Sequence, residues 1–159
     1  MKQIFLAIQA RLDSEVPALR YIDKDWQQLT IPQPPVQWPC CLIDLDSVDY
    51  TQLGGRARRA EAQITLTVAD EPLTRSSAQA PSKNEAYDTL DVVAAVRDTL
   101  HGWRVPGTTQ DLAVKNIAKT FRDKGHVVYT LTFATAWTER EPATPTAPAQ
   151  PAVTVRLVP

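Results

Sequence analysis

One stretch of the sequence, residues 57–69, constrains the fold more than any other. Its even positions are apolar, from Ala60 to Val68, and its odd positions are mostly polar, from Arg59 to Thr67. This period of two residues predicts one long β-strand with an apolar face and a water-exposed face. A strand of this length needs neighbouring strands on both edges and a cover over its apolar face. We therefore predict that the chain is built around this strand.

Length and composition limit the class of protein. The 159 residues fit one domain, and 43% of them are hydrophobic, which suffices for a core without disulfides or metals. The net charge of -1 argues against a generally basic nucleic-acid binder. Residues 1–12 lack the pattern of a signal peptide, and no apolar run reaches the roughly 18 residues of a membrane span. A cytoplasmic protein without a membrane partner is expected.

The adjacent Cys40 and Cys41 are expected to be free thiols. Neighbouring cysteines rarely form a disulfide, and in a strand their side chains point to opposite faces. Free thiols are typical of a reducing compartment, in agreement with a cytoplasmic location.

Two helices are predicted. Residues 2–12 form an amphipathic helix that ends at Asp13 and Ser14. Residues 84–101 form the second, with a capping box at Ser82 and Glu85 and a stop at Gly102. The second helix is the natural cover for the apolar face of strand 57–69.

Further strands are predicted over 19–22, 40–46, 112–122 and 127–137, and a helical turn over 23–29. Four prolines make 30–39 an irregular connector, 70–81 is a loop, and 123–125 is a hairpin turn. We predict an α+β fold with a single, mostly antiparallel sheet that contains a long β-hairpin and is packed by two helices on one face. Residues 1–139 form this domain. Residues 140–159 are a Pro-rich tail, in which 153–158 retain a strand pattern.

The long hairpin is predicted to join 40–46 and 57–69 through a turn region, 48–56, which contains Gly54 and Gly55. Its charges are expected to pair across the hairpin, each pair contributing roughly 0.2–1 kcal/mol. The carboxylates are Asp44, Asp46 and Asp49, and the cations are Arg56, Arg58 and Arg59.

Other readings of these residues are weaker. The spacing of the three aspartates does not fit a calcium loop, and the glycines lack the Lys-Ser/Thr of a phosphate-binding loop. Neither His101 nor His126 lies near a Ser or Cys in a nucleophile motif. We therefore expect no metal, no cofactor, no catalytic residue and no enzyme activity. The arginines are either a solvated face or a basic arm that contacts a partner subunit or DNA phosphates.

The order of the predicted elements, with a length near 150 residues, resembles the tail terminator proteins of long-tailed bacteriophages. This family includes the lambda-type minor tail protein U and related neck and tail-completion proteins. The matching stretches are residues 4–12, 57–69, 84–101 and 127–137, and the segment GHVVYTLTF at 125–133 looks like the end of such domains. The resemblance covers about residues 1–140.

This resemblance implies a structural virion protein of a phage or prophage. Such proteins form a hexameric ring that caps the tail tube, stops its polymerisation and offers a surface to the head-tail connector protein, while DNA passes through the channel. The protein would occupy the host cytoplasm during assembly and then the virion tail. The six charged hairpin residues are then interface candidates, and Arg58→Glu is expected to damage assembly but not the fold. Alternatives are a nucleic-acid-binding module that uses the arginine arm, or another head–tail joining protein of similar fold.

Overall fold

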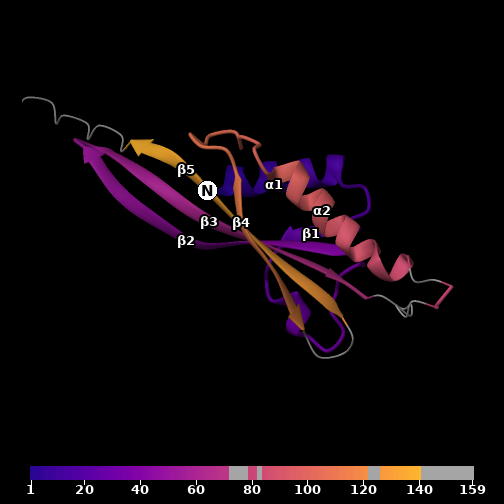
Figure 1. Ribbon diagram of the computed structural model, residues 1–159. Coiled ribbons are helices and arrows are strands. Elements are labelled where there is room, and N and C mark those ends of the chain that lie inside the picture. Colours follow the sequence, from indigo (N-terminus) through magenta and orange to yellow (C-terminus); the bar gives the residue numbers. More distant parts are fainter. Residues whose placement is uncertain (72–78, 82–83, 122–125, 141–159) are drawn as a thin grey trace, which may run out of the picture.

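The computed structural model describes residues 1–71, 79–81, 84–121 and 126–140. Within them, the strands form one five-stranded sheet with the order β1-β2-β3-β5-β4, and two α-helices pack on one of its faces (Figure 1). Only the β1–β2 pair is parallel. The predicted α+β fold with a mostly antiparallel sheet is confirmed. The elements are α1 (Lys2–Glu15), β1 (Tyr21–Lys24), β2 (Cys40–Gly54), β3 (Ala57–Asp70), α2 (Asp88–Leu100), β4 (Ala113–Phe121) and β5 (Val127–Arg140).

Strand β3 is the centre of the sheet, as predicted. It pairs along its length with β2 on one edge and with β5 on the other. Its even residues from Ala60 to Val68 are at most 3% exposed and lie in one core cluster with Ile8 of α1 and Val96 of α2. The helices therefore supply the cover that the alternating pattern required.

The other face of β3 is not wet along its whole length, contrary to the prediction. Thr67 and Ala69 are buried there, and Ala69 belongs to a second cluster with Cys40 and Val128. The residues that pack against this second cluster come mainly from the segment before β2, and they include Val36 and Trp38. The Pro-rich connector therefore covers one end of the open face.

Helix α1 is longer than predicted. It runs to Glu15, beyond Asp13 and Ser14, and the N–H of Val16 donates to the Leu12 carbonyl at 2.9 Å. The helix ends there because the following Pro17 disfavours helical backbone at the residue before it.

Helix α2 stops where the sequence predicts. His101 follows its last residue, and Gly102 has φ +77°, the left-handed conformation that favours glycine. A short 3₁₀ helix, Glu85–Tyr87, precedes it, so the predicted helix 84–101 divides into two parts. The predicted capping residue Ser82 lies outside the described residues.

The first strands differ most from expectation. Strand β1 begins at Tyr21, two residues after the predicted start, and a 3₁₀ helix at Gln28–Thr30 replaces the helical turn. The predicted turn region 48–56 is wrong, because β2 continues to Gly54. A β-bulge between Leu45 and Ser47 interrupts the period of two residues, which hides the second half of the strand in the sequence.

The C-terminal strands are confirmed as an antiparallel pair, and β5 continues three residues beyond Trp137. Most of the predicted loop 70–81, the predicted turn 123–125 and the tail from residue 141 lie outside the described residues. In the described part, no helix is both long and apolar enough to cross a membrane.

Candidate assembly surface

The outer halves of three strands project beyond the helices as an arm (Figure 1). We define the arm as residues 47–63 of β2 and β3 together with 134–140 of β5. Pairing extends to the tip, where Ala57 lies opposite both Gly54 and Arg140, although a register shift between Gln52 and Gly54 leaves Leu53 without an opposite residue on β3. Strand β4 pairs with β5 only as far as Ala134, so the arm has three strands. The predicted hairpin is therefore one part of a wider projection.

A tight turn closes the hairpin at the tip. Gly54 and Gly55 have φ of +110° and +56°, conformations that other residues rarely adopt. A Cβ atom added at either glycine would meet nothing within 4 Å. The backbone conformation, and not lack of space, therefore requires glycine here.

The turn fixes a register that contradicts the predicted pairing of aspartates with arginines. Gly54 lies opposite Ala57, and after a register shift at Leu53, Arg58 lies opposite Gln52 and Arg59 lies opposite Thr51. The arginines are thus too close to the turn to meet carboxylates in the first half of β2.

Arg58 is held on the face of the arm that continues the helix-covered face. Its guanidinium bonds Glu139 of β5 at 2.8 and 2.9 Å and lies 4.7 Å from the ring centroid of Tyr50. The other oxygen of Glu139 accepts a hydrogen bond from the Trp137 indole at 2.9 Å. The Trp137 N–H, followed by Arg58, lowers the pKa of Glu139 from its ordinary value. This cluster joins all three strands of the arm.

Arg59 projects from the opposite face, because successive side chains of a strand alternate. It bonds Glu61 of the same strand at 2.9 Å. Arg56 lies in the turn and is exposed. The three arginines therefore do not form one basic patch, and two of them are paired with carboxylates. This distribution does not favour a nucleic-acid-binding arm.

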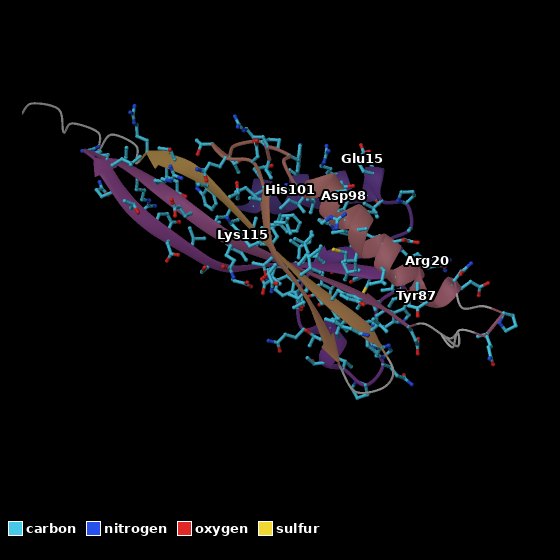
Figure 2. The ribbon with its side chains drawn as sticks, in the orientation of Figure 1. Glu15, Arg20, Tyr87, Asp98, His101 and Lys115 are labelled. Atoms are coloured by element: carbon cyan, nitrogen blue, oxygen red, sulfur yellow. The ribbon has the colours of Figure 1, made fainter. Side chains whose placement is uncertain are left out.

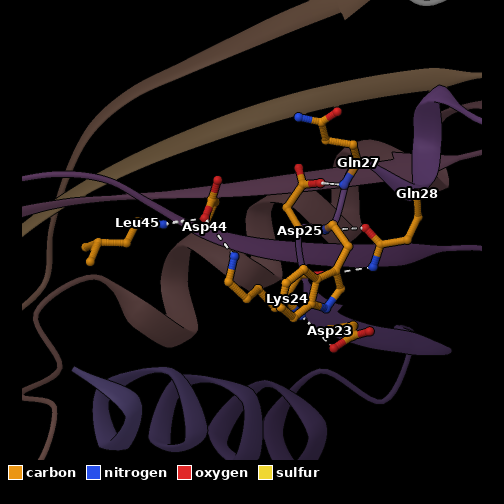
Figure 3. Close-up of polar contacts among 8 residues, drawn as sticks. Asp23, Lys24, Asp25, Gln27, Gln28, Asp44 and Leu45 are labelled. Carbon is orange, nitrogen blue, oxygen red and sulfur yellow. Dashed lines mark hydrogen bonds and ion pairs between the residues drawn. The ribbon is translucent and has the colours of Figure 1, made fainter.

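The three aspartates have separate surroundings. Asp44 lies 3.5 Å from Nζ of Lys24 on β1 and accepts a hydrogen bond from the Leu45 N–H (Figure 3). Asp46, at the bulge, accepts hydrogen bonds from Thr65 and Gln63.

Asp49 lies opposite Glu61, so two like charges face each other there. Among the described residues, no three His, Cys, Asp or Glu residues are grouped so that they could hold a metal ion.

A hollow between α1 and β1 was not predicted. It has a volume of about 540 Å³ and is lined by side chains that include Phe5, Leu6 and Trp26. Trp26 is 67% exposed, and Nζ of Lys24 lies 4.5 Å from its ring centroid. In the sequence, Trp26 lies between the polar residues Asp25 and Gln27, and this indicates that its side chain is not in the core.

The cysteines and histidines have structural surroundings. Both thiols are free and buried, and burial raises the pKa of Cys40 to about 12 and raises that of Cys41 as well. His101 accepts a hydrogen bond from the Val114 N–H at 3.3 Å, and His126 stacks on Trp38 with ring centroids 4.7 Å apart. A thiol that is neutral at physiological pH is a poor nucleophile, so burial makes Cys40 and Cys41 unreactive.

Comparisons with known proteins identify the fold and the family. A solved structure described as the virion of a native gene transfer agent particle contains a chain that matches with a TM-score of 0.55 and 14% identity. The match covers 87% of this chain and 96% of the other, so the two share the fold. No curated protein sequence matches. The sequence model of the phage tail terminator proteins matches residues 5–144, which include nearly all described elements. The chain therefore belongs to the phage tail terminator family, a family of structural tail proteins.

Proposed function

We propose that this protein is a tail terminator that assembles into a closed hexameric ring on the end of a phage tail tube. The ring stops polymerisation of the tube protein and presents its other side to the head-tail connector protein, and DNA passes through its channel. Assembly takes place in the host cytoplasm and leaves the protein in the virion tail. The observation that carries this proposal is the family match over residues 5–144.

The geometry supports a role in assembly rather than in catalysis. The most distinctive feature of the fold is the projecting arm, where exposed residues such as Tyr50 and Leu53 are available to a partner. A closed ring needs two different complementary surfaces on each subunit, and it does not need a pocket for a small substrate. The arm is a suitable candidate for one of these surfaces.

The charged residues of the hairpin are proposed to belong to that surface. Asp49 and Arg56 are exposed near the tip, and Asp46 is exposed where the arm begins. Arg58 and Arg59 are already paired within the subunit, so we propose that they shape the arm and meet a neighbour through their exposed parts. Asp44 lies at the base of the hairpin beside Lys24.

The ring is tested by measuring the size of the purified full-length chain with multi-angle light scattering and by imaging it in negative stain. Six-fold rings, alone or after addition of tail tubes from the same phage, are the expected result. Removal of the gene from the phage should give tail tubes of variable, excessive length, and supply of the protein in trans should restore uniform tails. Tubes of normal length in the deletion strain would overturn the proposal.

A further inference from the structure

Among the described residues, four strand edges lack a partner strand. Helix α1 lies against the outer edge of β1, where Gln9 donates to the Ile22 carbonyl, and the backbone at 109–110 donates to the Ala136 carbonyl on the edge of β5 beyond β4. The other two edges, on β2 and β4, are open.

Strand β1 pairs with β2 only along Cys40–Ile43, so β2 is bonded to β3 alone from Asp44 onward. Strand β4 is last in the sheet and is bonded to β5 alone. Each of these edges presents backbone N–H and C=O groups that another strand can bond.

A β-bulge lies at the start of each open edge. The bulge of β2 is at Asp46. The bulge of β4 is at Lys115, the residue labelled on that strand in Figure 2. Because a bulge interrupts regular pairing and β2 has a second register shift between Gln52 and Gly54, the segments suited to a new partner strand are 47–52 of β2 and 116–121 of β4.

The two open edges carry opposite charge. From Asp44 to Gly54, β2 contains three aspartates and neither Lys nor Arg, whereas β4 contains Lys115 and Lys119 and neither Asp nor Glu. The hydrogen-bond partners of Asp46 are neutral, and Asp49 faces another carboxylate. Asp44 is paired with Lys24, whereas Asp46 and Asp49 form no ion pair within the described part of the chain, so this edge keeps a net negative charge there.

Both edges also expose apolar side chains. Tyr50 and Leu53 of β2 are 46% and 55% exposed, and Ile117 of β4 is 38% exposed. In a pair of strands, such side chains pack against each other across the ladder.

We propose that the β2 edge of one copy pairs with the β4 edge of the next copy and continues the sheet from subunit to subunit. This inference rests on the proposed ring and names the two surfaces that close it. The contact joins different surfaces of one chain, so it is head-to-tail and able to close into a ring. A β2–β2 contact would place aspartates together, and a β4–β4 contact would place lysines together, so the charges select the head-to-tail pairing.

Charges on an edge strand can instead protect it from unwanted pairing. The two roles predict different results when the charges are reversed. A protective charge works with either sign, whereas a charge that faces an opposite charge on the neighbour must keep its sign.

The test uses two full-length double variants. Asp46→Lys with Asp49→Lys makes both edges basic, and Lys115→Glu with Lys119→Glu makes both edges acidic. Each variant alone should self-associate about tenfold or more weakly than the wild type in light scattering. An equimolar mixture should assemble again, because each basic edge then meets an acidic one.

Single variants and matched controls keep the test decisive. Asp49→Lys and Lys115→Glu, whose side chains lie on the same face of the sheet, replace the double variants if circular dichroism shows that those do not fold. Asp13→Lys and Arg20→Glu reverse exposed charges outside both edges and should leave self-association unchanged.

Two outcomes would overturn the inference, and they differ in what they say about the ring. If both double variants form the same rings as the wild type, the edge pairing is wrong but the ring stands. A wild-type chain that stays monomeric with and without tail tubes, together with a variant mixture that does not associate, overturns the ring as well.

Discussion

Strands β2, β3 and β5 pass through two regions that are stabilised in different ways. Under the helices, large apolar side chains such as Ile64 and Phe133 are at most 1% exposed. In the arm, the helix-side face keeps Ala60 and Trp137 buried, and beyond them the outer pairs are Arg58–Glu139 and Arg59–Glu61. One set of strands thus contains a hydrophobic core at one end and a polar projection at the other.

The difference separates stability from recognition. Full burial of a large apolar side chain contributes roughly 1.5–3 kcal/mol, whereas an exposed ion pair contributes about 0–1 kcal/mol. Substitutions in the outer arm should therefore change the contacts of the protein with little effect on its folding. The following predictions test this separation, beginning with the largest expected effect.

Phe133→Ala should lower the free energy of unfolding by about 3–5 kcal/mol, because it removes a fully buried ring and leaves a cavity. Leu53→Ala, at the exposed tip, is the matched control and should change it by no more than about 0.5 kcal/mol. Urea unfolding of the two variants gives both values. If both variants lost a similar free energy of unfolding, the side chains of the arm would contribute to stability as much as those of the core.

Cys41→Ser should cost about 1–3 kcal/mol, because the new hydroxyl is buried among apolar side chains of the core. Ser47→Ala, on the exposed part of the same strand, should have almost no effect. Thermal unfolding at neutral pH checks the pair. If the Cys41→Ser variant were as stable as the wild type, the new hydroxyl would have to find water or another hydrogen-bond partner in this part of the core.

Glu139→Gln should lower stability at neutral pH by no more than about 1 kcal/mol, because Arg58 and Glu139 are both partly exposed. The folded state lowers the pKa of Glu139, so its ionised form contributes stability above the ordinary carboxyl pKa. That contribution disappears as the pH falls through the lowered pKa, and the two proteins should then be equally stable. Urea midpoints measured between about pH 7 and pH 3 test this, and a difference independent of pH would contradict it.

Patterns that are local in sequence predicted the core. The alternation at Ala60–Val68 and the helical spacing of Ile4, Ile8 and Leu12 each place apolar side chains on one face of one element. Because both periods are properties of a single segment, no knowledge of the partner was needed.

The arm shows what such patterns miss. Arg58 and Glu139 are 81 residues apart in the sequence, and only the β3–β5 register brings them together. The error over the aspartates was avoidable in part. A tight turn at Gly54 and Gly55 already places the arginines beside the residues just before the turn. The burial of Ala69 beneath the Pro-rich connector was not predictable, because nothing in that irregular segment specifies which face it covers.

The bulge at Asp46 has a consequence for how β2 tolerates change in length. Cys41, Ile43 and Leu45 face the main core at odd positions, and beyond the bulge it is Val48, at an even position, that packs there. Asp46 thus shifts the phase of the pleat by one residue. A single-residue deletion inside a strand normally turns every later side chain to the wrong face. Here, loss of Asp46 would bring Val48 into phase with Leu45, so β2 can lose a residue at this bulge and still direct its apolar side chains to the core.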